Sequence, residues 1–248
     1  MSKLTRNNPG FLHFDITGFI RISRNPLTLL HDLNNLIKEC HFNGGNIFIP
    51  LYSYSYTDNE EYSLKKSVSK LGKVSDYFRI LHPEKRTIDA IFSYAAFSNW
   101  VNRKYFQISN YATFSKGSLI DDIFNKDGLL MSVGRRLHYS TEVHYIERLL
   151  EVKYRFDKNF HGTFIDLDNN KHSQVVTYFC RDLEFAKKMN ITVSFEKLFN
   201  DLQDLGIVQN YYINGDFHLE VVNLQQVYDY LKIKLPNDPF YLMKKIKE

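Results

Sequence analysis

The stretch Gly128–Val152, GLLMSVGRRLHYSTEVHYIERLLEV, decides the fold. It opens with a short apolar run, Leu129–Val133, which is long enough for a buried strand and ends at Gly134. Beyond Ser140 and Thr141, apolar residues recur at helical spacing, at Val143, Ile146, Leu149 and Leu150. The stretch therefore predicts a strand, a turn and then a helix that is capped by Ser140 or Thr141.

Two titratable residues occupy the first turns of that helix. His144 and Glu147 are three residues apart, so their side chains can meet on one face. Open α/β sheets usually bind ligands at the carboxyl ends of their strands, beside helix starts. We therefore expect His144 to act as a catalytic base and Glu147 to orient its ring. The plain alternative is a structural histidine in a pair that arises by chance.

The sequence before this stretch predicts two parallel strands joined by a helix. Strands are expected at Phe11–Thr17 and Asn46–Leu51, with a helix that begins at Pro26 between them. Farther along, Ile88–Phe97 is expected to form another strand, and Ser118 to cap the helix that follows it.

Antiparallel strands are favoured in the C-terminal part. Tyr154–Asp168 and Ser173–Phe179 are expected to pair, and Asn214-Gly215 is a strong hairpin turn signal. Pro236 is expected to begin a short terminal helix. The predicted fold is mixed α/β: a single three-layer domain over residues 1–248, with a central mixed sheet flanked by helices and an antiparallel C-terminal part.

Composition places the chain among soluble globular proteins. Of its 248 residues, 44% are hydrophobic and 24% are charged, and no apolar run approaches a membrane span. The start lacks the apolar core of a signal peptide, and two cysteines fit a reducing compartment. No Cys/His cluster has zinc-ligand spacing. We expect a cytoplasmic protein without a metal site, a membrane partner or a nucleic-acid partner, because the net charge of +4 is spread along the chain.

Six separated stretches resemble, in order, segments of the aminoglycoside 3-N-acetyltransferase family. They are FLHFDI at 11–16, FIPLYSYSY at 48–56, RTIDAIFSYAA at 86–96, FSKGSLIDDI at 114–123, LLMSVG at 129–134 and HYSTEVHYIER at 138–148. The last is similar to the family pattern D-S-N-T-x-x-H-x-x-E and weighs most. The likeness covers roughly residues 11–160, and within the family it points to the branch that acylates nucleotide-linked amino sugars.

The chain departs from the family pattern where the acceptor would sit. Asp89-Ala90 stands in place of the usual His-Pro, Ser140 replaces an Asn, and His138 replaces an Asp. His144 and Glu147 remain in place. The resemblance therefore implies the family's chemistry with altered acceptor binding.

That chemistry is the transfer of an acyl group from coenzyme A to a primary amine, which must lose a proton before it attacks the thioester. His144 is the expected base, and a dimer is implied only by the resemblance. Neither Cys40 nor Cys180 has an activating motif for the rival acyl-enzyme route. The residues expected at the cofactor are Asp15, Ser93, Gly117 and Ser118, of which Ser118 is equally well explained as a plain helix cap. Those expected at the acceptor are Tyr52, Tyr54, Asp89, Ser140 and Thr141.

Charge and aromatic content favour an anionic acceptor. An aminoglycoside is a polycation, whereas this chain is basic and has a tyrosine-rich loop, YSYSYTDNEEYS, after Pro50. We therefore expect an N-acyltransferase, using acetyl or hydroxyacyl coenzyme A, that acts on a nucleotide-linked amino deoxysugar in bacterial surface-polysaccharide (lipopolysaccharide) synthesis. The alternatives are an aminoglycoside 3-N-acetyltransferase of antibiotic resistance, and a non-catalytic protein that binds a nucleotide or small molecule on the same scaffold.

Overall fold

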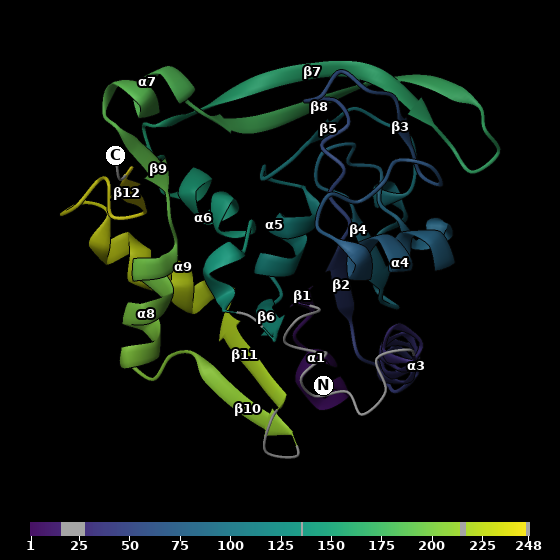
Figure 1. The fold of residues 1–248 in the computed structure, drawn as a ribbon, viewed down its shortest axis with the longest axis horizontal. Helices are drawn as coiled ribbons and strands as arrows, with labels where there is room; N and C mark the ends of the chain where they lie inside the picture. The colour runs from purple at the N-terminus through teal and green to yellow at the C-terminus, as the bar shows by residue number, and fades with distance from the viewer. Residues whose placement is uncertain (16–27, 135, 214–216, 247–248) are drawn as a thin grey trace.

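A mixed six-stranded sheet forms the centre of the computed structural model, which describes residues 1–15, 28–134, 136–213 and 217–246 (Figure 1). The strand order is β10-β11-β6-β1-β2-β4. β1 pairs in parallel with β2 and β6, as the sequence predicted for the first two strands, whereas β4, β11 and β10 join antiparallel. The strands are β1 (Gly10–Phe14), β2 (Ile47–Pro50), β4 (Tyr94–Phe97), β6 (Leu129–Val133), β10 (Gln209–Ile213) and β11 (Phe217–Asn223). Thr17, Pro26 and the Asn214-Gly215 turn lie outside the described residues.

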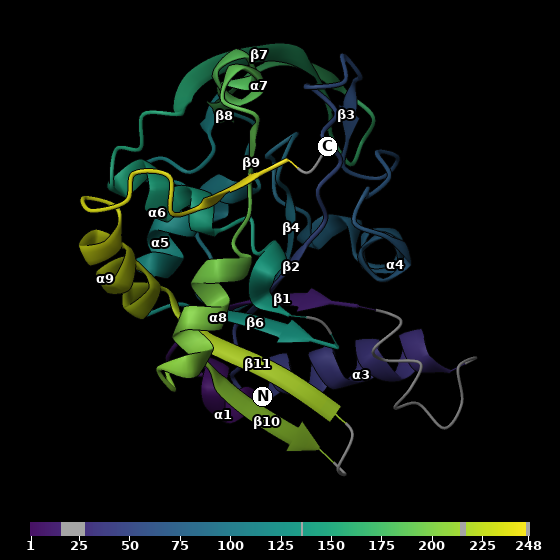
Figure 2. The ribbon, with the colours of Figure 1, turned by 60° about the vertical axis from the view of Figure 1, so that its left-hand side comes forward.

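Helices cover both faces of this sheet because its strands are apolar on both sides. Leu12 and Met131 face a core with α3 and α4, whereas Phe11 and Leu130 face a core with α5, α6, α8 and α9 (Figures 1 and 2). No helix in the described part of the chain is both long and apolar enough to cross a bilayer. The helices are α1 (Ser2–Thr5), α3 (Leu29–Phe42), α4 (Lys73–Leu81), α5 (Leu119–Phe124), α6 (Val143–Leu149), α7 (Leu183–Lys188), α8 (Glu196–Asp204) and α9 (Leu224–Lys234).

A long hairpin arches over α5 and α6 at the top of Figure 1. Its strands, β7 (Arg155–Ile165) and β8 (Lys171–Arg181), pair antiparallel as predicted, and the short β3 (Tyr62–Ser63) and β5 (Tyr111–Ala112) complete a second sheet. This hairpin supplies one wall of the cavity described below.

Three predictions of local structure are wrong. Only the second half of Ile88–Phe97 is a strand, because Asp89 instead accepts the backbone N–H groups of the next turn. The segment after Pro236 is not a helix: it turns and becomes β12 (Met243–Lys245), which pairs with β9 (Ile191–Val193). The N-cap of α6 is Glu142, without a side-chain capping bond, and not Ser140 or Thr141. By contrast Ser118 caps α5, accepting the N–H of Asp121 at 3.3 Å.

Arg86, which forms a β-bridge with Ala95 of the edge strand β4, ties three separate segments together. Only 1% of it is exposed, yet no carboxylate pairs with it among the described residues. Its guanidinium instead donates to the Oγ of Ser93 at 3.0 Å and to the carbonyls of Ser67 at 2.7 Å and Leu51 at 3.0 Å. Leu51 and Ser93 are buried, so Arg86 contributes hydrogen bonds to acceptors that water does not readily reach.

We predict that Arg86→Met lowers the free energy of unfolding by at least about 2 kcal/mol, because several buried acceptors lose their donor. Urea unfolding followed by circular dichroism measures the loss. Arg103→Met, at an exposed arginine, is the matched control and should change stability by less than about 0.5 kcal/mol. Equal effects of the two substitutions would contradict this role of Arg86.

Candidate active site

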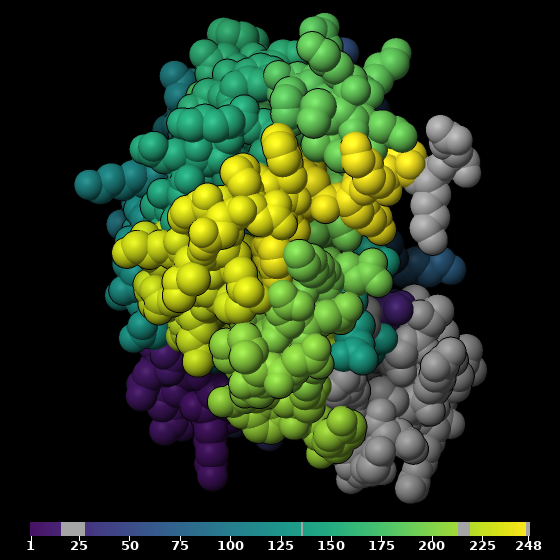
Figure 3. Space-filling view, turned by 90° about the vertical axis from the view of Figure 1, so that its left-hand side faces the viewer, coloured from purple at the N-terminus to yellow at the C-terminus, as the bar shows by residue number. Residues whose placement is uncertain are grey.

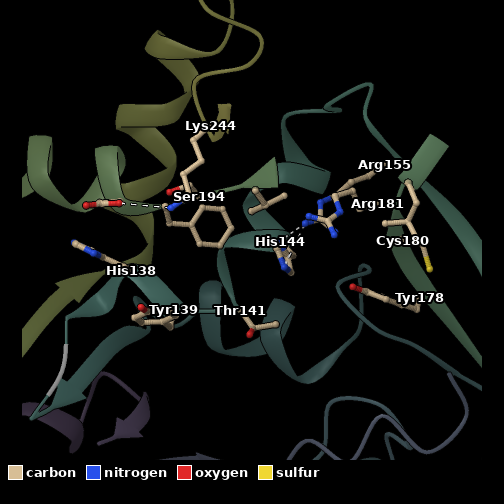
Figure 4. A pocket seen from close by; sticks show the side chains of 14 residues that line it. His138, Tyr139, Thr141, His144, Arg155, Tyr178, Cys180, Arg181, Ser194 and Lys244 are labelled. Carbon is tan, nitrogen blue, oxygen red and sulfur yellow. Dashed lines mark hydrogen bonds and ion pairs between the residues drawn. The ribbon is translucent and has the colours of Figure 1, made fainter. Parts of the chain in front are cut away.

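A cavity of about 510 Å³ opens beside the first turns of α6 (Figure 4). Its floor is the turn and helix that follow β6, which carry His138, Thr141 and His144. The β7/β8 hairpin adds one wall, with Arg155 and Tyr178 among its residues. The opposite wall comes from the segment between β9 and α8 and from β12, through Ser194, Phe195, Glu196 and Lys244. The cavity thus lies beyond the carboxyl end of β6, as ligand sites in open α/β sheets usually do.

His144 and Glu147 meet in the wall of this cavity. The Nδ1 atom of His144 lies 2.6 Å from the Oε2 atom of Glu147, which confirms the contact expected from their spacing. The carboxylate of Glu147 is completely buried, whereas 14% of the His144 side chain is exposed to the cavity. With a proton on Nδ1 donated to Glu147, the Nε2 atom keeps its lone pair and is able to accept a proton.

Two residues from the start of the hairpin complete the surroundings of Glu147. Tyr154 donates its hydroxyl to Oε1 at 2.8 Å, and the Nε atom of Arg155 forms an ion pair with Oε2 at 2.8 Å. The Nη2 atom of Arg155 also lies 2.8 Å from Nδ1 of His144 and 3.3 Å from Nε2, so the guanidinium and the imidazole face each other in Figure 4. Since Nδ1 cannot donate and accept at once, it serves either Glu147 or Arg155.

Burial and neighbouring charges set the protonation of this group. Burial lowers the pKa of His144, and the positive charge of Arg155 lowers it further, while Glu147 opposes both. Burial alone would raise the pKa of Glu147, but the charges of His144 and Arg155 outweigh it, so the pKa of Glu147 falls below its usual range. The arrangement is therefore a neutral imidazole beside an ionised carboxylate at neutral pH, which suits a general base.

A second buried carboxylate lies at the start of the same helix. Glu142 is completely buried and accepts hydrogen bonds from the hydroxyls of Tyr52 and Tyr94, each at 2.9 Å. Its Oε2 atom lies 2.9 Å from Nε2 of His13 on β1. Burial raises the pKa of Glu142, but the charge and hydrogen bond of His13 outweigh burial and lower it overall. This network ties the beginning of α6 to β1 and β4.

The structure places the residues predicted for the acceptor in different surroundings. Thr141 lines the main cavity, and the adjacent Ser140 is buried. Tyr52 belongs to the Glu142 network and packs edge-on against Tyr54, which lies outside the lining of the cavity. Asp89 is buried and accepts hydrogen bonds from its own turn. Their roles in binding stay predictions.

The residues predicted for the cofactor are likewise not gathered around His144. Gly117 and Ser118 line a separate pocket of about 230 Å³ with Lys116. Ser93 is completely buried and bonded to Arg86 and to the carbonyl of Leu51. Asp15 follows β1 directly, and its N–H donates to Val133 on β6.

Cationic side chains outnumber acidic ones around the main cavity. Among the described residues, Arg155, Arg181 and Lys244 line it, against the carboxylate of Glu196, which lies 3.8 Å from Lys244. Burial raises the pKa of the Cys180 thiol to about 11, so this lining cysteine stays protonated and is a poor nucleophile. Within the described ranges, no group of three or more His, Cys, Asp or Glu residues is placed to hold a metal ion.

Similarity to solved structures connects this geometry with a known fold. No protein-family model and no curated protein matches the chain. The apoenzyme of aminoglycoside acetyltransferase AAC(3)-IVa is similar with a TM-score of 0.62 and 19% identity, over 96% of this chain and 85% of that one. AAC-IIIb in its binary structure with CoASH gives 0.66 and 13%, over 94% and 91%. Sisomicin-bound AAC-VIa gives 0.69 and 13%, over 93% of each chain. The chain therefore has the fold of the aminoglycoside acetyltransferases.

We predict that Arg155→Gln raises the pKa of His144, because it removes a positive charge next to the ring. The titration of His144, followed by NMR of its imidazole, measures the shift. Lys158→Gln, at an exposed residue on the same strand, is the control and should leave the titration unchanged. A fall in the pKa of the Arg155→Gln variant would show that Arg155 does not act on the ring through its charge.

Proposed function

We propose that the protein is an acyl-coenzyme A-dependent N-acyltransferase that acts on a nucleotide-linked amino deoxysugar. The single observation that carries the proposal is the His144 imidazole, held 2.6 Å from the buried Glu147 in the wall of a cavity of about 510 Å³. The fold supports it, since solved proteins with this fold include aminoglycoside acetyltransferases, one of them in a binary structure with CoASH.

His144 performs the proton transfer in this proposal. Coenzyme A supplies the acyl thioester when bound. The ammonium form of the amine first releases one proton to solvent, and the Nε2 atom accepts the second proton, which the nitrogen loses as it bonds to the thioester carbon. Glu147 stabilises the resulting imidazolium through Nδ1–H. The same proton then leaves Nε2 for the departing thiolate, which restores the neutral ring.

The acceptor is proposed from the charges of the cavity. Glu147 compensates the charge of Arg155. Arg181 and Lys244 are therefore the lining cations that would repel a polycationic aminoglycoside, against the attraction of Glu196. His138, which stands where the resembling family has an acidic residue, also lines the cavity. A pyrophosphate suits the two arginines, and exposed aromatic faces suit a base. We place such a reaction in bacterial surface-polysaccharide synthesis, in the cytoplasm.

We predict that purified protein releases free thiol from acetyl-coenzyme A in the presence of an amino-sugar nucleotide, and that His144→Ala slows this release by roughly 100-fold or more. Calorimetric binding of coenzyme A should survive the substitution. Because the pKa of His144 lies below its usual value of about 6.5, protonation of His144 should lower the wild-type rate only in acidic solution, below the pH range in which the amine itself titrates. If coenzyme A binds but no amine supports the release of thiol from acetyl-coenzyme A, the protein is instead non-catalytic.

A second prediction separates the two acceptor classes. The double variant Arg181→Glu/Lys244→Glu should raise the KM for the amino-sugar nucleotide at least about tenfold with little change in kcat, because it reverses two charges at the cavity rim. Lys66→Glu, at an exposed residue away from the cavity lining, is the matched control. Thiol release with aminoglycosides alone would refute the acceptor class and leave the acyltransferase intact.

A further inference from the structure

A second large cavity, of about 490 Å³, lies between the end of α6, α7 and the chain that follows α9. It is nearly as large as the main cavity but shares no lining residue with it. Figure 3 shows this side of the molecule, where the C-terminal part in yellow lies against green and teal segments. A cavity of this size is in the range that holds small ligands and exceeds the gap left by one misfitting side chain.

Apolar side chains make up most of its lining. Phe185 of α7 and Phe240 after α9 stack with their ring centres 5.9 Å apart, which fixes the two segments against each other. Phe240 is 40% exposed, so part of this apolar side chain is in contact with solvent. A ligand bound in the cavity would cover it. The other apolar members are Leu150, Val152, Leu235, Pro236 and Pro239.

Two ammonium groups complement this apolar lining. Lys153 and Lys232 both line the cavity and are exposed, and neither forms an ion pair among the described residues. The Nζ atom of Lys232 lies 5.8 Å from the ring centre of Tyr228, which is not a lining residue, so a ligand in the cavity would compete with that ring for the ammonium group. Glu151 is the only acidic side chain in the lining. A ligand with an apolar body and one negative charge would satisfy both the lining and its excess positive charge.

Tyr154 connects this cavity with the candidate active site. Tyr154 is one of the lining residues although it is only 2% exposed, and its hydroxyl donates to the Oε1 atom of Glu147 at 2.8 Å. An occupant of the cavity would therefore pack against the residue that holds Glu147 in place.

We propose that this second cavity is a binding site for a small amphipathic monoanion, with a medium-chain fatty acid as the ligand class. The apolar chain lies against Phe185, Phe240 and Tyr154, and the carboxylate pairs with Lys153 and with Lys232 once its ammonium group leaves the ring of Tyr228. This site is separate from the one proposed for acyl transfer, and binding to it requires neither coenzyme A nor turnover.

Isothermal titration of the full chain with dodecanoate, below the concentration at which it forms micelles, tests the proposal. We expect one dodecanoate per chain. Dodecyltrimethylammonium, which has the same chain and the opposite head charge, should bind at least tenfold more weakly, and acetate should not bind. Absence of dodecanoate binding, or equal binding of the cationic amphiphile, would overturn the proposal.

Two variants test whether dodecanoate binds in this cavity. If one of them does not fold, the other still gives a result. Lys153→Glu/Lys232→Glu changes only exposed side chains and should weaken dodecanoate at least tenfold, whereas Lys66→Glu should not. Phe240→Asp places a charge in the apolar wall and should abolish binding. Circular dichroism confirms that each variant is folded. Unchanged affinity in a folded Lys153→Glu/Lys232→Glu variant would place dodecanoate elsewhere and contradict the assignment.

Discussion

The buried charge of Glu147 is the constraint on which the candidate site depends. An ionised carboxylate out of reach of water costs several kcal/mol unless partners compensate it. Here the partners are His144, Tyr154 and Arg155, which between them occupy both carboxylate oxygens. Tyr154 and Arg155 come from the chain that enters the β7/β8 hairpin, so the position of that hairpin against α6 follows from the need to satisfy one anion.

A second buried anion holds the other end of the same short helix. Glu142 is bonded to Tyr52, Tyr94 and His13, which belong to the central sheet or to the loop that leaves it. α6 is therefore anchored to the sheet through Glu142 and to the hairpin through Glu147, with His144 between the two anchors. Since a helix of seven residues is not stable on its own, these polar contacts and its apolar face fix where His144 points.

Local sequence patterns correctly predicted the structural features that are set by residues close together in the sequence. The strand Leu129–Val133, the helix after it and the contact of His144 with Glu147 all follow from periodicity and from the geometry of one helix turn. Arg155 was missed because its place depends on a turn at Glu151, whose φ of 51° reverses the chain after α6. The strand β12 was missed because its partner β9 is about fifty residues away in the sequence, where no local pattern reports it.

Resemblance, too, located residues along the chain without showing how deeply they are buried. Ser93 and Asp89 stand at motif positions, yet both are buried and form hydrogen bonds with other residues of the protein. Ser93 accepts from Arg86, and Asp89 accepts from the backbone of the turn at Ile91. Burial is set by how distant segments pack, and a motif read from one sequence contains no information about that packing. The motif residues on α6 are different because the helix brings its own His144 and Glu147 together.

The opposing charges around His144 suit a group that must both take and give a proton. Arg155 disfavours the imidazolium, and Glu147 favours it, so neither protonation state is strongly trapped. With Glu147 alone, a buried imidazolium would form a tight ion pair and hold its proton. With Arg155 alone, the ring would be too weak a base to take one from an amine. The proposed transfer, from a nitrogen to a departing sulfur through one ring, requires the balance that the two neighbours set together.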